Sequence, residues 1–380
     1  MVATPTPVSG CIDVRTVKSS HAVELYILAA PTRPAPAADQ AKETCAAISR
    51  VLQAHDAWIM EERVFASSNA LEFICAVRSR TYAPRAGGVT PLRIEIAPGG
   101  AGEVAGIQVH AVCGTPQPEV LCLDEAPVGR VLRNKDAAFL TLSAITSPEA
   151  GAPEAQAFRS FEKAEQLLKQ AGGDFFSVAR TWWWLDRICS WYGEFNHARS
   201  AFFTQRGLLT GKPTTHRMPA STGIGMQPLG GPACALDVVA IIAPKEKTRC
   251  FNGAGNQHSA FNYGSAFSRV SRTNTPGGET VFVSGTAAID AKGTTTHVGD
   301  AAGQIDDTIQ NVCAVLKDMQ CRDDDVVHAI AYCKTPEVEQ VWNKTREKLG
   351  WPFITVLADV CREELLFEVE ATACPGAKRA

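Results

Sequence analysis

The sequence predicts an α+β fold in which similar units, each a mixed sheet covered by helices, are repeated within one chain. Two observations lead to this fold class. Segments with period-2 alternation of apolar residues are interleaved with segments that carry an apolar stripe of helical period. The order of these segments then recurs, which indicates an internal repeat. We place the repeats within three regions, residues 1–130, 131–245 and 246–380.

The C-terminal region shows the pattern most clearly. Residues 277–289 alternate as a strand, and the next helix has a single apolar stripe formed by Ile305, Ile309, Val312, Cys313 and Leu316. The remaining predicted elements are a strand at 326–333, a helix running to 349, and strands at 354–358 and 365–373.

The middle region follows the same order. It opens with a strand at 139–145, and a helix with an apolar side follows at 158–171. Residues 178–185 (VARTWWWL) are apolar on both faces, which predicts a strand lying between two layers. A helix at 191–203, the loop PASTGIGM and a strand at 236–243 complete this copy.

The N-terminal region carries the weakest pattern. A strand at 23–30, a helix at 40–55 and a strand near 63–66 suggest a third, degenerate copy.

Composition excludes several classes of function. The net charge of −3 gives no reason to expect nucleic acid or an anionic membrane as a partner, and no run reaches the ~18 apolar residues of a membrane span. The 13 cysteines contain no C-x-x-C pair and the 8 histidines no H-x-x-x-H pair. We therefore expect reduced thiols, no metal and no cofactor. The N-terminus does not resemble a signal peptide, which favours the cytoplasm.

The closing segment ELLFEVEATA, residues 364–373, places two carboxylates on one face of a strand. Alternate side chains share a face, so Glu368 and Glu370 point the same way, about 7 Å apart. Two carboxylates so close raise each other's pKa, which can prepare a carboxylic acid to donate a proton near neutral pH. The alternative is a strand with one solvent-exposed face, on which both glutamates are solvated.

The two repeats can be compared at this strand. If the closing strands are aligned on Ala243 and Ala373, Val238 lies opposite Glu368 and Ala240 opposite Glu370. This alignment predicts that the fold does not require carboxylates at either position.

Five segments resemble a known family in order and spacing: RTWWWLDRICSWYGEFNHAR, PASTGIG, YGSAFSR, VSGTAAI and ADVCREELLFEVEA. Each repeat resembles the fold of the Rid (YjgF-type) deaminases, and the whole chain resembles the chorismatases, which remove pyruvate from chorismate. The resemblance implies a pseudo-trimeric arrangement of Rid-like units within one chain, which favours a monomer, with chorismate as the small-molecule partner. It covers residues 135–373, and the first 130 residues match only loosely.

The resemblance also implies roles for individual residues. Glu368 corresponds to the general acid that protonates the enolpyruvyl group, with Glu370 as its supporting neighbour. Arg217 and Arg269 are candidates to bind carboxylates, because the guanidinium fork contacts both oxygens. The remaining candidates for substrate contact are Tyr263, Ser221 and Cys361.

Cys361 resembles the position, seven residues before the acid, that distinguishes chorismatase subtypes. A cysteine there resembles the subtype that forms 3-hydroxybenzoate, in one variant with 4-hydroxybenzoate. The other subtype is hydrolytic and forms a dihydroxycyclohexadiene carboxylate.

Two further alternatives remain open. A Rid-like imine deaminase needs an arginine about fifteen residues before the first closing glutamate, where this chain has Phe353. A non-catalytic binder of small metabolites could keep the cleft, but would have no need of Glu368.

Overall fold

The computed structural model describes residues 11–97, 102–243 and 247–380. The predicted boundary between residues 245 and 246, and most of the N-terminal segment considered for a signal peptide, lie outside these ranges. None of the helices in the described ranges has the length and apolar character needed to cross a membrane.

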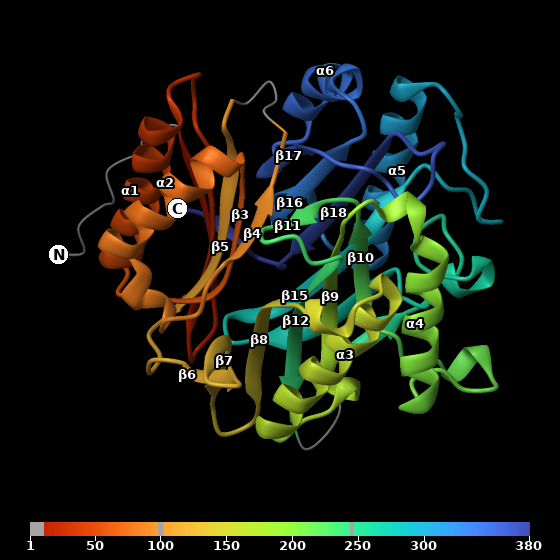
Figure 1. Cartoon of the computed structure of the whole chain (residues 1–380), viewed down its shortest axis with the longest axis horizontal. Helices are drawn as coiled ribbons and strands as arrows, with labels where there is room; N and C mark the ends of the chain where they lie inside the picture. The colour runs from red at the N-terminus through yellow and green to blue at the C-terminus, as the bar shows by residue number, and fades with distance from the viewer. Residues whose placement is uncertain (1–10, 98–101, 244–246) are drawn as a thin grey trace.

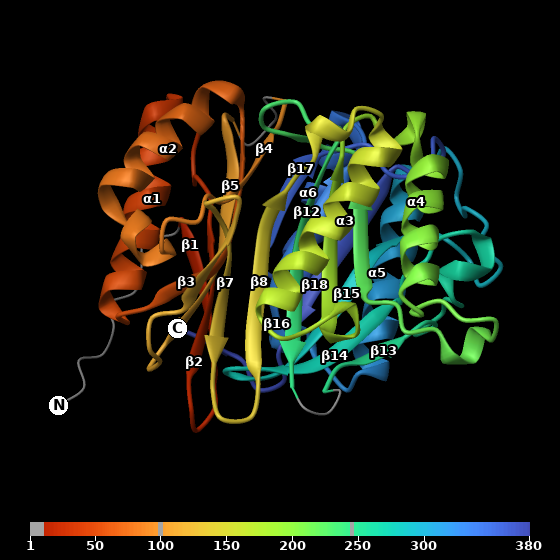
Figure 2. The ribbon, with the colours of Figure 1, turned by 60° about the horizontal axis from the view of Figure 1, so that its bottom comes forward.

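The chain forms three mixed sheets, and each is covered on its outer side by two helices (Figures 1 and 2). The first sheet has the order β11-β4-β3-β5-β2-β1-β19 and lies beneath α1 and α2. Its elements are β1 (Ile12–Lys18), β2 (Val23–Ala29), α1 (Ala37–Ala54), β3 (Trp58–Ala66), α2 (Ser68–Thr81), β4 (Leu92–Glu95), β5 (Val104–Cys113), β11 (Gln227–Pro228) and β19 (Lys378–Arg379).

The second and third sheets repeat this order from β4 to β1. The second runs β10-β9-β12-β8-β7-β6 and the third β17-β16-β18-β15-β14-β13. The elements of the second unit are β6 (Glu119–Leu123), β7 (Ala126–Arg133), β8 (Ala138–Ile145), α3 (Pro153–Gln170), β9 (Val178–Leu185), α4 (Tyr192–Gln205), β10 (Ala220–Ile224) and β12 (Cys234–Ile242). Those of the third are β13 (Arg249–Phe251), β14 (Val270–Thr275), β15 (Gly278–Ala287), α5 (Ala301–Asp318), β16 (Val326–Cys333), α6 (Pro336–Thr345), β17 (Phe353–Leu357) and β18 (Phe367–Ala373).

The predicted α+β class with repeated units in one chain is confirmed. The N-terminal residues, where the sequence pattern indicated only three elements, form a complete sheet with two helices.

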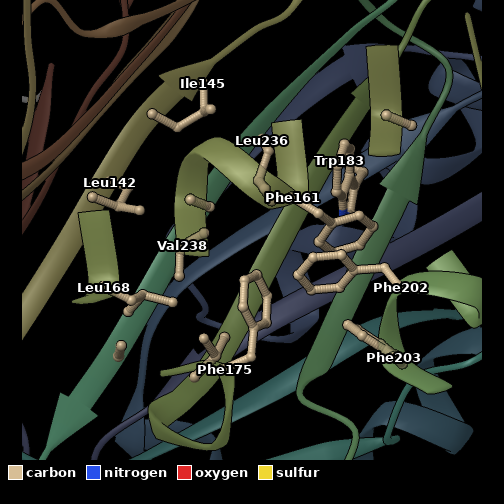
Figure 3. Close-up of a cluster of buried hydrophobic side chains, with 14 of the residues drawn as sticks. Leu142, Ile145, Phe161, Leu168, Phe175, Trp183, Phe202, Phe203, Leu236 and Val238 are labelled. Carbon is tan, nitrogen blue, oxygen red and sulfur yellow. The ribbon is translucent and has the colours of Figure 1, made fainter. Parts of the chain in front are cut away.

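Apolar side chains fill two kinds of core. One kind lies between each sheet and its own helices, as in the aromatic cluster of the second unit around Phe161, Phe202 and Trp183 (Figure 3). The other lies between the inner faces of the three sheets, where Trp182, Phe282 and Ile354 belong to one cluster. Each sheet is therefore buried on both faces, and a polar side chain on an inner face needs a partner.

Polar partners on the inner faces join the sheets in a closed cycle. Arg63 of the first sheet pairs with Asp237 of the second at 2.9 Å, and Arg180 of the second pairs with Glu370 of the third at 2.8 Å. Glu24 of the first sheet closes the cycle, because it accepts hydrogen bonds from Thr275 Oγ1 (2.6 Å) and from the backbone nitrogen of Gly277 (2.9 Å).

Strand register corrects the alignment of the closing strands made from sequence. Strands β5, β12 and β18 hold equivalent places in the three sheets. In each sheet the neighbouring strand (β3, β9 or β16) has one extra residue, and this irregularity lies beside His110, Val239 and Thr372. Counting back two residues gives the equivalent positions Gln108, Asp237 and Glu370, and counting back four gives Gly106, Ala235 and Glu368.

The expected pairing of Val238 with Glu368 and of Ala240 with Glu370 is therefore wrong. The position of Glu370 is polar in every sheet and acidic in two. Only the position of Glu368 changes from a small apolar residue to an acid.

We expect Asp237→Asn to lower the free energy of unfolding by about 2–3 kcal/mol. Breaking a buried ion pair is costly, and the loss stays at the low end because Arg63 keeps Glu61 at 2.8 Å. Denaturation in urea at pH 7 measures the change. The control Glu119→Gln removes an exposed pair with Arg133 and is expected to cost under about 0.5 kcal/mol. Equal losses in the two variants would contradict the role of Asp237 in joining the first and second sheets.

Candidate active site

A pocket of about 160 Å³ lies where β10 of the second sheet contacts β15 of the third, and β18 also lines it. A single ordered water needs about 10–15 Å³ by this measure, so the pocket has room for a small organic molecule. Helix α4 and two loops, around residues 263–269 and 361–362, complete its walls.

Glu368 reaches this pocket because successive side chains of β18 point to opposite faces of the sheet. Phe367 and Val369 pack into the core beneath α5 and α6, which turns Glu368 and Glu370 to the inner face. Each glutamate is only 5% exposed. Gly285 on β15 leaves the space that the Glu368 carboxyl occupies, because a Cβ at position 285 would lie 2.0 Å from Oε1.

Burial raises the pKa of Glu368 to about 8, and the charge of Glu370 adds to this effect. Arg180 and Arg269 act in the opposite direction. A carboxyl group with this pKa is mostly protonated at neutral pH and can serve as a general acid.

Glu370 lies behind the pocket wall. It accepts hydrogen bonds from Arg180 Nη2 and from Trp182 Nε1, both at 2.8 Å. Arg180 Nη2 also donates to Thr222 Oγ1 at 2.5 Å, and Thr222 Oγ1 accepts a 2.9 Å bond from the Gly285 backbone. Glu370 therefore acts on Glu368 through its charge and through the position of the strand that holds Gly285.

Three arginines line the pocket: Arg199 on α4, Arg269 before β14, and Arg362. Arg199 and Arg269 are each 2% exposed, and none of the three forms an ion pair with a carboxylate in the described ranges. Burial lowers the pKa of Arg199, and its Nε has no hydrogen-bond partner. Because a buried cation without an anion is costly, this arrangement suits a ligand that carries negative charge.

Neighbouring groups hold the arginines in place. Arg199 donates to Asn196 Oδ1, and Arg269 donates to the His258 carbonyl at 3.0 Å and to the Tyr263 hydroxyl. Arg362 donates to the carbonyl of Gly293 at 2.8 Å. The guanidinium forks thus keep fixed directions while the pocket is open to a ligand.

Of the seven residues named from the sequence, five line this pocket: Glu368, Arg269, Tyr263, Ser221 and Cys361. Ser221 accepts a hydrogen bond from Thr181 Oγ1 at 2.9 Å. Burial raises the pKa of the Cys361 thiol to about 12, so the thiol is neutral.

Glu370 and Arg217 do not line the pocket. Arg217 donates to the carbonyl of Phe176 at 2.9 Å and to Cys250 Sγ at 2.7 Å, which directs its guanidinium to the start of β9.

The lining residues that were not named from the sequence include Tyr192, Asn196, Arg199 and Arg362. The first three lie within the segment RTWWWLDRICSWYGEFNHAR, and Arg362 follows Cys361. The spacing of Tyr192, Asn196 and Arg199, four residues and then three, was the available signal, because residues so spaced share one face of a helix.

No cluster of three or more histidine, cysteine, aspartate or glutamate side chains in the described ranges is arranged to hold a metal ion.

We expect Glu368→Gln to change how stability depends on pH. Folding raises the pKa of Glu368 from 4.5 to about 8, so the native state keeps a proton that the unfolded chain has released between these values. Stability therefore falls as the pH rises through this window, and glutamine removes this loss. Between pH 6 and 9 the advantage of the variant should grow by about 2–3 kcal/mol, measured by urea denaturation. Parallel curves for the two proteins would show that Glu368 has an ordinary pKa.

The chain is similar to known proteins at two levels. Residues 260–374 match the family model described as Endoribonuclease L-PSP. A solved structure of a chorismatase matches 94% of this chain and 99% of its own, with a TM-score of 0.63 and 17% identity. A comparison with curated proteins found no match.

Shorter solved structures match about a third of the chain. The yeast protein YEO7 covers 33% of this chain and 98% of its own at 18% identity, with a TM-score of 0.28. The Rid family protein YyfA from Yersinia pestis covers 33% and 98% at 19% identity, with a TM-score of 0.29. The match to the chorismatase structure shows that the chain shares its fold over nearly the whole length.

Proposed function

We propose that this pocket binds chorismate and releases pyruvate from it, leaving a hydroxybenzoate. One observation carries the proposal: a buried carboxyl group with a pKa near 8 faces a pocket lined by three arginines that have no carboxylate partner in the described ranges. Chorismate carries two carboxylates and an enolpyruvyl ether, a group that acid cleaves. The fold shared with a chorismatase structure adds support.

The arginines account for binding of the substrate. Arg199 approaches the pocket from α4 of the second unit and Arg269 from the segment before β14 of the third, and Arg362 lies beside Cys361. Two carboxylates can thus be bound at separate points, which fixes the ring between them. Bound carboxylates would also supply the anions that these buried guanidinium groups lack.

Glu368 accounts for the chemistry. Its proton moves to the terminal methylene carbon, and the π electrons of the double bond form the new C–H bond. The neighbouring ether carbon becomes an oxocarbenium ion, stabilised by its oxygen, and the glutamate is left as an anion in the same enclosed space. The bond between the ether oxygen and the ring carbon then breaks, so that pyruvate leaves with that oxygen as its ketone. The ring cation loses a proton as it becomes aromatic, which balances the proton that Glu368 gave. No water is consumed, because chorismate has the combined composition of pyruvate and hydroxybenzoate.

The position of Cys361 favours 3-hydroxybenzoate, with or without 4-hydroxybenzoate, as the ring product. The side chain lines the pocket and packs against apolar clusters on both sides, and its thiol is neutral. A small neutral group here keeps water away from the cation, in agreement with the resemblance to benzoate-forming chorismatases. The alternative product is the dihydroxycyclohexadiene carboxylate of the hydrolytic subtype.

We also propose that the enzyme is a cytoplasmic monomer. One chain already supplies three sheets, and buried unpaired thiols such as Cys45, Cys234 and Cys333 suit a reducing compartment. Light scattering that gives twice the chain mass of 40.7 kDa would contradict the first part.

Incubation with chorismate should release pyruvate, followed by lactate dehydrogenase and NADH. Glu368→Gln should lower the rate at least 10³-fold, because amide protons are too weakly acidic to replace the carboxylic acid. The control Glu363→Gln changes an exposed glutamate in the segment before β18 and should retain the wild-type rate.

Chromatography of the same reaction identifies the ring product. The absence of pyruvate from wild-type reactions would exclude the chorismatase function. A dihydroxycyclohexadiene carboxylate as sole ring product would exclude the benzoate-forming subtype alone.

Gly285→Ala should lower kcat about 100-fold while the protein stays folded. The new methyl group would displace the end of the Glu368 side chain, and a shift of about 1 Å in a catalytic group can cost this much. Gly223→Ala is the matched control, because it lines the same pocket and its Cβ would meet no atom closer than 3.9 Å. Similar kcat values for the two variants would argue against Glu368 as the acid.

A further inference from the structure

The cleft between the first and second sheets is the structural counterpart of the candidate active site. In the active cleft, β10 contacts β15, and β18 also lines the pocket. Here β4 contacts β8, and β12 also lines the pocket; these strands hold the same places in their sheets. A pocket of about 260 Å³ remains at this junction, larger than the one beside Glu368. The third junction is closed, because Ile354 fills the space next to Gly106.

This second pocket has no carboxyl group at the position equivalent to Glu368. Ala235 lines it at the position equivalent to Glu368, and Ala144 lines it within the irregularity of β8 that corresponds to the one holding Gly285 on β15. No group that could protonate a ligand as Glu368 does stands at either position. The pocket can bind a ligand but lacks this chemistry.

The second pocket does contain a cation, which comes from a strand and not from a helix. Helices α2 and α4 have the same length of 14 residues, and Cys75 and Arg199 are each the eighth residue. Arg93 of β4 lines the second pocket and places Nη1 3.8 Å from Cys75 Sγ. The Arg93 guanidinium group thus contacts the position on α2 that corresponds to that of Arg199 on α4.

Arg93 is partly exposed, unlike the buried Arg199, but it shares with Arg199 the lack of a carboxylate partner. It forms no ion pair with a carboxylate in the described part of the chain, and the only side-chain acceptor described for it is the Cys75 sulfur. Apolar side chains, among them Pro127, Val128 and Leu229, form most of the remaining wall, and three hydroxyl side chains also line it, those of Thr90, Ser143 and Thr146. One cation beside a wall that is mostly apolar, with a few hydroxyl groups, suits a ligand with a single carboxylate on a ring, whereas the three arginines of the active cleft suit a dicarboxylate.

We propose that the cleft between the first and second sheets is a non-catalytic binding site for a small cyclic monocarboxylate, held by Arg93. The site is separate from the pocket that contains Glu368, and its occupancy does not depend on whether chorismate is turned over.

The test uses 4-fluorobenzoate and the full-length protein, observed by fluorine NMR. We expect a bound resonance that disappears, or whose dissociation constant rises at least tenfold, in Arg93→Met, because a charge-assisted hydrogen bond is lost. Ala235→Leu should abolish the same resonance by filling the cavity. Arg269→Met, which alters only the active cleft, should leave it unchanged, and 4-fluorobenzamide, which has no charge, should not produce it.

Thermal melts establish that each variant is folded. Persistence of every bound resonance in folded Arg93→Met, or in folded Ala235→Leu, overturns the proposal, as does a single resonance abolished by Arg269→Met alone. If one variant does not fold, the other decides. Because binding is read directly, an absence of chorismate turnover would leave this result intact, and an absence of binding here would leave the proposed function intact.

Discussion

Buried charges between sheets are the constraint on which the rest of this molecule depends. Each sheet is covered by helices on one side and by the other sheets on the other, so its inner face cannot be solvated. Carboxylates at Asp237 and Glu370 are tolerated there only because Arg63 and Arg180 reach across from a neighbouring sheet. The same contacts fix how the sheets meet, and the meeting of the second and third sheets forms the candidate site.

The pair formed by Arg180 and Glu370 couples this architecture to the acid. Burial raises the pKa of Glu368 most, and the charge of Glu370 adds to the increase. Arg180 limits it, because its positive charge favours the ionised form of Glu368. Neither residue needs to touch a ligand in order to influence the proton that Glu368 holds. The carboxyl at position 368 keeps its place because the strand opposite carries Gly285, whose backbone is in turn tied to Thr222 and Arg180.

Periodicity in the sequence was enough to predict the class of fold, the helices with apolar stripes and the shared face of Glu368 and Glu370. Each of these depends on residues a few positions apart, whose geometry is local. The alignment of Val238 with Glu368 failed because it matched the ends of the two strands. Strand β12 continues to Ile242, past Ala240, which is the equivalent of the last residue of β18, and this difference in length is invisible in the residue types alone. Arg199 and Arg362 were missed because their convergence on one pocket depends on the docking of α4 against a segment more than 160 residues away.

The three junctions between sheets show how a fold with pseudo-threefold symmetry can carry a single acid. At the position of Glu370 every sheet has a polar residue, with Gln108 donating to the Ala329 carbonyl where the others have ion pairs, so this position serves the contact between sheets. At the position of Glu368 the residues are Gly106, Ala235 and Glu368, and their surroundings differ accordingly: one is filled by Ile354, one is an open pocket, and one is lined by arginines. An acid can be buried at this position only where cations and a glycine accommodate it. Since the described surroundings of Ala235 and Gly106 lack that combination, the asymmetry of the site follows from its neighbours as much as from the glutamate itself.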